Sequence, residues 1–315
     1  RRVEAATRVR EPGLAPGEGK ALQEEVSAIL ALRQPGGMAA AAARFSMTPM
    51  DLSVSFRCPK AIVEAAAMAT MTETYTYNVF RNAQALQILP LLPVADAIVT
   101  DPPYGETSLQ WDVWPDGWPD VAALVAPQVW CFGSMRMFLD KRGDLADWKL
   151  AQDVVWEKHN GSNSANDRFR RLHELALHFY RGEWEPLFKA PQFTNDATAR
   201  TVRRKARPPH WGDIGPSSYA SEDGGPKLMG SVIYARSCHG YAVNETQKPE
   251  DIVAPLLQYS VPPGGLVVDC FAGSGTVGAV ARKTGRRAIL IEKRESQCKA
   301  IAQRLAQGDL LTANF

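Results

Sequence analysis

The chain has 315 residues, a formal net charge of +2, 45% hydrophobic residues and 22% charged residues. These are ordinary values for a globular protein, so they exclude a fibrous class and a chain that is disordered throughout. A chain of this length has room for one large α/β domain with a small accessory module.

The cysteines and the apolar runs bear on cellular location. Five cysteines occur at wide spacing, without the CxxC pairs of zinc sites or the dense framework of disulfide-rich proteins. The sequence has no run of about 18 apolar residues and no N-terminal apolar block before a cleavage site. We therefore expect a soluble, cytoplasmic protein that binds neither a metal nor a membrane.

Residues 1–70 differ in composition from the rest, and we expect an N-terminal extension that is helical or partly disordered. The segment 52–66 is similar to a short motif of superfamily 1 DNA helicases. The nearest phosphate-loop candidate, however, has Leu14 in place of the first glycine and Ala21 in place of the magnesium-binding Ser or Thr. The sequence therefore does not predict ATP hydrolysis.

From residue 71 to 184, short apolar runs alternate with helical sequence. The run at 96–100 predicts a strand that ends on DPPYG, and 128–133 predicts a second strand. Further strands are predicted at 153–156 and 174–180. Each run stops at a polar or Gly/Pro loop, which is typical of buried parallel strands.

Residues 185–243 lose this rhythm and are rich in Pro, Gly, Ser, Arg and Asp, so they predict an insert of long loops with small pieces of regular structure. The alternation resumes over 244–315. It predicts helices at 249–260, 276–284 and 296–306, with strands at LVVDC and at 287–292. The later part of this segment forms a strand–helix–strand unit of the dinucleotide-binding kind.

The loop that follows LVVDC satisfies GxGxxG, and such loops bring the backbone close to a ligand at a helix N-terminus. Glu292 ends the next strand, where a carboxylate can accept both ribose hydroxyls of NAD or of S-adenosylmethionine. Asp269, just before the loop, would repel a pyrophosphate but suits the cationic methionine part of S-adenosylmethionine. We therefore prefer the methyl donor and keep an NAD-dependent oxidoreductase as the alternative. The expected cofactor residues are Asp269, Phe271, Ala272, Gly273, Ser274, Gly275, Thr276 and Glu292.

The DPPYG loop carries the chemistry. The exocyclic amine of a base is a poor nucleophile, because its lone pair is delocalised into the ring. Asp101 and the carbonyl of Pro102 supply two acceptors for the amine hydrogens, and Pro103 helps to fix the loop. Tyr104 offers a flat face to a base flipped out of the duplex. The absence of a Pro-Cys dipeptide disfavours methylation at carbon 5 of cytosine.

The order of these motifs resembles the β class of DNA amino-methyltransferases over residues 77–305. NETQKPE before the cofactor loop is similar to the family block that ends in T-x-K-P, so Thr246, Lys248 and Pro249 carry over. WEKHN at 156–160 and HE at 173–174 resemble the blocks around the target-base pocket. SVIY at 231–234 resembles the point where the chain re-enters the core. Two positions depart from the pattern, Asn244 where His is usual and Asn82 where an acidic residue is usual.

The resemblance implies a doubly wound, mostly parallel seven-strand methyltransferase sheet with helices on both faces, one reversed strand and a target-recognition insert. It implies S-adenosylmethionine as cofactor, with Asp101, Thr246 and Lys248 joining its site. It also implies sequence-specific methylation of adenine N6 in duplex DNA, because DPPY with aspartate is the commoner adenine form, with N4 of cytosine as the alternative. A homodimer, a cognate restriction endonuclease and a bacterial or phage setting at the nucleoid are compatible with it.

Positive charge is concentrated in the insert, where such charges neutralise phosphates or bind guanine. The expected DNA-contacting residues are Arg200, Arg203, Arg204, Lys205 and Arg207 in the insert, with Asn82, Lys158 and Asn160 outside it.

Overall fold

In a computed structural model of the protein, the structure describes residues 77–81, 89, 92–162, 167–204, 217–238, 242 and 246–312. The predicted extension at 1–70 lies outside these residues. So do four of the positions singled out in the sequence, namely Asn82, Lys205, Arg207 and Asn244.

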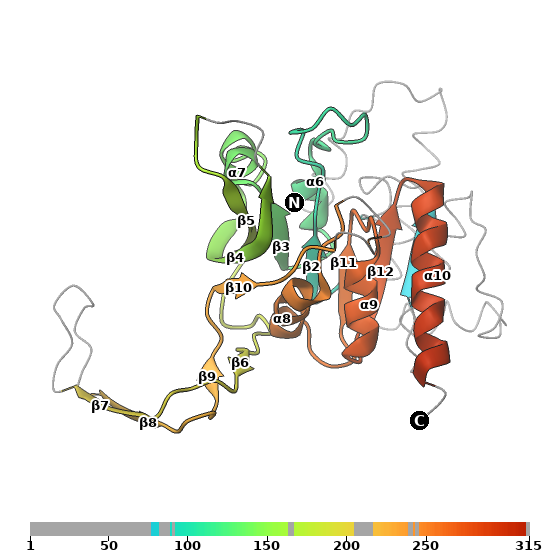
Figure 1. Ribbon diagram of the computed structural model, residues 1–315. Helices are drawn as coiled ribbons and strands as arrows, with labels where there is room; N and C mark the ends of the chain where they lie inside the picture. Colours follow the sequence, from blue (N-terminus) through green and yellow to red (C-terminus); the bar gives the residue numbers. More distant parts are fainter. Residues whose placement is uncertain are drawn as a thin grey trace, which may run out of the picture.

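One eight-stranded sheet forms the centre of the described fold (Figure 1). Its strands, in order across the sheet, are β1 (Tyr77–Arg81), β12 (Arg287–Glu292), β11 (Leu266–Asp269), β2 (Ala97–Thr100), β3 (Gln128–Gly133), β5 (Arg171–Tyr180), β4 (Lys149–Ser162) and β10 (Val232–Tyr234).

The strand directions agree with the expected methyltransferase sheet. All neighbouring pairs are parallel except those of β5, which runs antiparallel to both β3 and β4. Seven strands were expected, and the eighth is β10, which adds three residues to the edge beside β4. β10 comes from the range 185–243 that we assigned to the insert, so the end of that range contributes to the main sheet.

The central strands are buried, and most of their residues are apolar. Every residue of β2, β3 and β11 is buried, as the short apolar runs predicted. The run 174–180 was predicted as a parallel strand, and this direction is wrong, because β5 is antiparallel. An apolar run indicates that a strand is buried but not in which direction it runs. The direction of β5 follows from its antiparallel pairing with β3 and β4. Both strands also extend beyond the predicted runs into exposed, polar sequence.

Helices cover both faces of the sheet. On one face, α6 (Trp118–Ala122) and α7 (Met135–Asp140) pack into a core that includes Trp118 and Phe138. On the other, α8 (Glu250–Ser260), α9 (Thr276–Lys283) and α10 (Glu295–Thr312) pack into a second core. Close approach of α9 to β12 requires Gly278, where an added Cβ would lie 2.6 Å from Leu290 Cδ1.

The insert forms two small antiparallel pairs. β6 (Phe193–Thr194) pairs with β9 (Lys227–Leu228), and β7 (Arg200–Arg204) pairs with β8 (Ser217–Ser221). The β7–β8 ribbon extends away from the main sheet (Figure 1). Among the described helices, none has the length and apolar character needed to cross a membrane.

Candidate active site

The two predicted loops lie side by side at the carboxyl ends of two central strands of the sheet. β2 and β11 are adjacent parallel strands, so the loops that follow them, DPPYG and FAGSG, emerge at the same end. A hydrogen bond joins the two strand ends, because Thr100 Oγ1 donates to Asp269 Oδ1 over 2.8 Å. The tertiary structure thus brings together the residues predicted for the reaction and those predicted for the cofactor.

Asp101 is held by two donors. The Tyr104 hydroxyl donates to Asp101 Oδ1 over 2.6 Å, and the Lys248 ammonium contacts Asp101 Oδ2. Burial raises the pKa of Asp101 above its usual value, although the nearby ammonium opposes this effect. Burial and the neighbouring carboxylate raise the pKa of Tyr104 well above its usual range, so its hydroxyl stays a donor.

Lys248 also faces a second carboxylate. Its Nζ lies 3.5 Å from Glu174 Oε2, while Lys158 contacts the other oxygen of Glu174. Although burial opposes it, the two ammonium groups hold the pKa of Glu174 below its usual value. Burial also opposes the shift at Lys248, but Asp101 and Glu174 together raise the pKa of that lysine. Asp101, Lys248, Glu174 and Lys158 therefore form a partly buried charge network in which negative and positive side chains alternate.

The charge network gives Glu174 and Lys158 structural partners that the sequence analysis did not predict. The dipeptide at 173–174 was matched to the target-base pocket, but no role was assigned to Glu174, and the dipeptide was its only sequence signal. Lys158 was predicted to contact DNA; in the structure it forms an ion pair with Glu174 and lies over the Trp156 ring at 4.5 Å.

Asp112 anchors the DPPYG loop, and the sequence analysis missed it. Its carboxylate accepts backbone N–H groups from Gly105, Glu106 and Thr107 over 2.9, 3.1 and 2.8 Å. Burial opposes the shift, but these hydrogen bonds lower the pKa of Asp112. An isolated aspartate shortly after a turn gives no signal of this role in the sequence.

The cofactor loop depends on backbone conformations that favour glycine. Gly273 and Gly275 have φ of 50° and 72°, in the left-handed region. An added Cβ on Gly275 would lie 2.9 Å from Ile301 Cγ2, so α10 packs against the turn that begins α9. The N–H of Gly273 donates to Glu292 Oε2 over 2.9 Å. The carboxylate at the end of β12 therefore lies directly against the glycine loop.

Asp269 lies beneath this loop. It accepts hydrogen bonds from Thr100 Oγ1 and, over 3.1 Å, from the backbone N–H of Phe271. Both donors are neutral, and burial raises the pKa of Asp269 to about 7.

Lys248 links the two loops through its backbone as well as its side chain. Thr276 Oγ1, at the start of α9, donates to the Lys248 carbonyl over 3.0 Å. Arg304 from α10 donates to the Ser274 carbonyl over 3.0 Å and so braces the same turn. Of the other residues matched to the T-x-K-P block, Thr246 is exposed.

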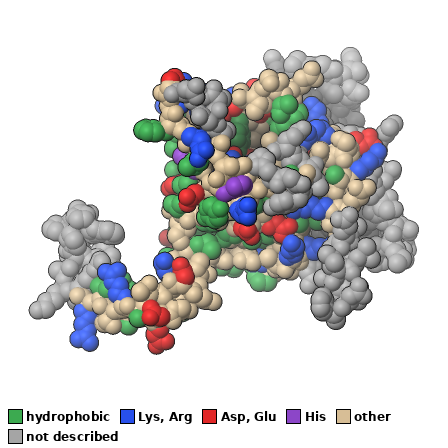
Figure 2. Space-filling model, in the orientation of Figure 1, with side chains coloured by type: hydrophobic (Ala, Val, Ile, Leu, Met, Phe, Trp, Pro, Cys, Tyr) green, Lys and Arg blue, Asp and Glu red, His purple; other side chains and the backbone are tan. Residues whose placement is uncertain are grey.

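The residues predicted to bind DNA occupy different places. Arg200 and Arg203 are exposed on the β7–β8 ribbon, away from the DPPYG loop, and Figure 2 shows basic side chains along this ribbon. Arg204 ends β7. Asn160 Oδ1 accepts a hydrogen bond of 2.7 Å from Ser237 Oγ.

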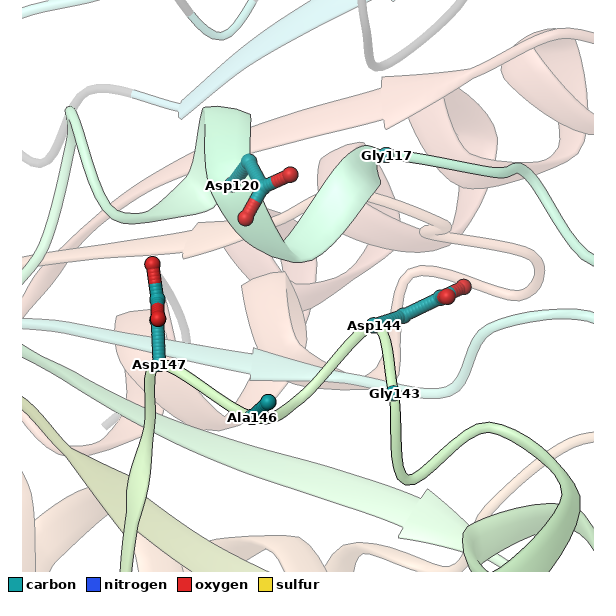
Figure 3. A pocket seen from close by; sticks show the side chains of 6 residues that line it. All are labelled: Gly117, Asp120, Gly143, Asp144, Ala146 and Asp147. Carbon is teal, nitrogen blue, oxygen red and sulfur yellow. The ribbon is translucent and has the colours of Figure 1, made fainter.

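A separate surface hollow of about 320 Å³ lies elsewhere and contains none of the predicted site residues (Figure 3). Asp120, Asp144 and Asp147 contribute to its lining, and their carboxylates point in different directions. Asp144 Oδ2 accepts a hydrogen bond of 2.6 Å from Trp114 Nε1. Across the described part of the chain, no group of three or more His, Cys, Asp or Glu side chains is arranged to hold a metal ion.

Comparison with known proteins adds sequence relatives. The chain is 29% identical over 159 residues to the Type II methyltransferase M.XycI of Xanthomonas campestris pv. cyanopsidis, covering 50% of this chain and 45% of that protein. It is 29% identical over 163 residues to the Type II methyltransferase M.HinfI of Haemophilus influenzae, covering 51% of this chain and 40% of that protein. The chain thus spans less than half the length of these curated relatives.

Solved structures share the fold. The M1.HpyAVI–SAM complex matches with a TM-score of 0.50 and 22% identity, covering 73% of this chain and all of that one. The PvuII DNA methyltransferase, described as cytosine-N4-specific, matches with a TM-score of 0.50 and 15% identity, covering 74% of this chain and 88% of that one.

The family assignment follows from a match that includes both loops. The model of the N6_N4_Mtase family, described as DNA methylase, matches residues 95–304, which span the strands β2 to β12 and most of α10. The chain therefore belongs to the N6_N4_Mtase family of DNA methylases.

Proposed function

We propose that this protein transfers a methyl group from S-adenosylmethionine to the exocyclic N6 of adenine in duplex DNA. The observation that carries the proposal is the position of Asp101, at the end of β2 beside the glycine loop that follows β11. Family membership supports methyl transfer rather than the hydride transfer that the glycine loop alone leaves open.

The residues at the glycine loop fit S-adenosylmethionine. The left-handed Gly273 and Gly275 allow the backbone to approach the ligand closely. Glu292 lies against this loop, where its carboxylate can accept the ribose hydroxyls. Asp269 adds acidic character that suits a cationic ligand. Phe271, Ala272, Ser274 and Thr276 complete the loop, and Thr246 and Lys248 lie before it in sequence.

The protein then has to activate a weak nucleophile and remove a proton. S-adenosylmethionine supplies an electrophilic methyl group. Asp101 and the carbonyl of Pro102 accept the amine hydrogens and localise the nitrogen lone pair. Pro103 restricts the loop, and Asp112 fixes the segment that follows it. The proton lost from the amine passes to the Asp101 carboxylate.

DNA binding is assigned to the insert and to the rim of the site. A base must leave the stack to reach Asp101, and Tyr104 offers it an aromatic face. The β7–β8 ribbon carries Arg200, Arg203 and Arg204, which suit phosphate or guanine. The other proposed DNA contacts are Asn82, Asn160, Lys205 and Arg207. Lys158 is proposed to act on the site through its ion pair with Glu174.

Domain organisation and partners belong to the same proposal. We assign residues 71–184 to the catalytic half, 185–243 to the target-recognition insert and 244–315 to the cofactor half. The two relatives are named Type II methyltransferases, which supports a restriction-modification role with a cognate endonuclease. The family resemblance supports a homodimer.

The test is methyl transfer by the purified chain. S-adenosylmethionine with a labelled methyl group is mixed with several kilobases of unmodified duplex DNA made by amplification, and the nucleosides are analysed. We expect labelled N6-methyl-2′-deoxyadenosine. N4-methyl-2′-deoxycytidine would instead assign the cytosine alternative, and the absence of label in DNA would contradict the proposal.

Replacement of the proposed acceptor is the first prediction. Asp101→Ala removes both carboxylate oxygens, so we expect methyl transfer to fall by at least a factor of about 100, the lower end of the effect of general acid–base groups. The glycine loop is unchanged in this variant, so calorimetry should still detect binding of S-adenosylmethionine. Retained turnover would remove Asp101 from its role.

A further inference from the structure

The charge network contains a carboxylate oxygen that lacks a hydrogen bond. Glu174 Oε2 is buried and makes no hydrogen bond within the described residues. It faces Lys248 Nζ at 3.5 Å, a distance that allows ion-pair attraction but not a well-formed hydrogen bond. A buried, unsatisfied carboxylate oxygen is costly, so its position beside an ammonium group calls for an explanation.

Lys248 occupies an acceptor that the proposed reaction needs. Its ammonium contacts Asp101 Oδ2, and the Tyr104 hydroxyl already bonds Oδ1. An amine hydrogen that approaches this carboxylate would therefore compete with a cation for Oδ2. The same cation would weaken the proton affinity that Asp101 needs after methyl transfer.

We propose that Glu174 is a positioning residue that receives the Lys248 ammonium when the amine of the target base takes Asp101 Oδ2. This inference rests on the proposed function. As the nitrogen–methyl bond forms and the sulfur–methyl bond breaks, the amine proton passes to Asp101, from which Lys248 has withdrawn. After the product leaves, Asp101 loses this proton to water, and the Lys248 ammonium returns to the ionised carboxylate.

The geometry makes the movement short. To bring Lys248 Nζ from 3.5 Å to hydrogen-bond distance of Glu174 Oε2 takes less than about 1 Å. The Lys248 backbone is fixed by the hydrogen bond from Thr276, so the four-carbon side chain makes the movement. The ring centroids of Tyr104 and Phe132 lie 5.9 and 5.4 Å from Lys248 Nζ, so the two rings confine the ammonium near both carboxylates. Lys158 engages Glu174 Oε1 and leaves Oε2 directed at Lys248.

The charged and titratable groups around Asp101 come from several elements. Those that act on it or on its partners are Tyr104 in its own loop, Cys131 on β3, Arg171 and Glu174 on β5, Lys158 on β4, Lys248 before α8, and Asp269 and Glu292 at the ends of β11 and β12. Among them, Glu174 raises the pKa of Asp101 and Lys248 lowers it.

The first test compares Glu174→Gln with the matched variant Glu183→Gln, which changes an exposed carboxylate just after β5. Single-turnover methylation of the amplified duplex is measured against pH with enzyme in excess. For Glu174→Gln we expect a rate at least tenfold below wild type and unchanged cofactor affinity. The acid limb of the profile should move to lower pH, because a negative charge that raises the pKa of Asp101 is gone. Glu183→Gln should match the wild type.

The variant Glu174→Asp distinguishes the loss of the negative charge from a folding defect. It keeps the charge, so the acid limb should stay at the wild-type pH while the rate lies between those of the wild type and Glu174→Gln. A wild-type rate and acid limb in Glu174→Gln would overturn the inference.

A second test needs neither DNA nor cofactor. Unfolding free energies are measured for Asp101→Asn, Glu174→Gln and the double variant. Each single variant leaves Lys248 one carboxylate, whereas the double variant leaves it none, so the double loss should exceed the sum of the single losses. Additive losses would overturn the inference. If the wild type fails to methylate DNA, the proposed function is wrong, and this cycle still decides whether Glu174 is the second partner of Lys248.

Discussion

Two carboxylates at neighbouring strand ends, the partly buried Asp101 and the buried Asp269, differ in the charge of their partners. Asp101 contacts the Lys248 ammonium, whereas Asp269 accepts hydrogen bonds from the neutral Thr100 hydroxyl and the Phe271 N–H. An ammonium stabilises an ionised carboxylate far more than a neutral donor does. Asp269 therefore binds a proton near neutral pH, at a position where the proposed cationic ligand would favour its ionisation.

This difference predicts a pH dependence of stability. The pKa of Asp269 rises from 3.8 to about 7 on folding, so the folded state binds this proton more tightly than the unfolded chain. The stabilisation is complete below pH 3.8 and is lost as pH rises to about 7. Asp269→Asn has no such proton to lose. As pH rises from 4 to 8, the wild type should therefore lose a few kcal/mol of unfolding free energy relative to Asp269→Asn, on the order expected from such a shift.

Urea unfolding at pH 4, 6 and 8 measures this change, with Asp153→Asn as the control at an exposed position on β4. The control should follow the wild-type profile. Parallel profiles for Asp269→Asn and the wild type would show that Asp269 ionises alike in the folded and unfolded chains.

At the scale of elements, the β7–β8 ribbon is separate from the sheet that positions the chemistry (Figure 1). Its register places Arg200 opposite Ser221 and Arg203 opposite Ser218, and both arginines are exposed. Side chains alternate along a strand, so Arg200 and Arg203 project from opposite faces of the ribbon. A two-stranded ribbon of this kind can enter the major groove of DNA.

The separation predicts that DNA binding and cofactor binding respond independently. In Arg200→Ala/Arg203→Ala, the affinity for duplex DNA should fall and the slope of log affinity against log salt should decrease by about 2, roughly one for each phosphate that is no longer neutralised. Fluorescence anisotropy at several salt concentrations gives both quantities. The double variant Arg142→Ala/Lys299→Ala removes exposed charges elsewhere and should retain the wild-type slope. An unchanged slope in the ribbon variant would contradict phosphate binding by these arginines.

At the scale of the whole molecule, the proposed catalytic half and the proposed cofactor half share one sheet. β2 from the first half pairs with β11 from the second, and β1 pairs with β12. The core on each face likewise draws residues from both halves. Neither half can therefore bury its strands without the other, and the described sheet should unfold as a unit.

Cofactor binding should accordingly stabilise the whole sheet. At 100 times its dissociation constant, a ligand that binds only the folded state adds about 2.7 kcal/mol. We expect S-adenosylmethionine to shift a single urea transition, seen alike by circular dichroism and by tryptophan fluorescence. Two transitions, of which only one moves with the cofactor, would show that the halves unfold separately.

The sequence predicted much of the fold through local patterns. β3 and β12 have the predicted residues, and α8 and α9 begin within one residue of the predicted starts. The predicted last helix was too short, since α10 runs from Glu295 to Thr312. Such boundaries can be read from sequence because turn residues and apolar periodicity act within a few positions.

The sequence by itself determined the position of the two loops, because DPPYG and FAGSG contain the proposed acceptors and the glycines within a few consecutive residues. Only the tertiary structure decided the direction of β5, the addition of β10 and the charge network at Asp101. Lys248 and Asp101 are 147 residues apart, and their contact requires the order of strands across the sheet. An apolar or polar pattern records which residues of a segment are buried, whereas the partner of a buried charge depends on which segments the sheet places together.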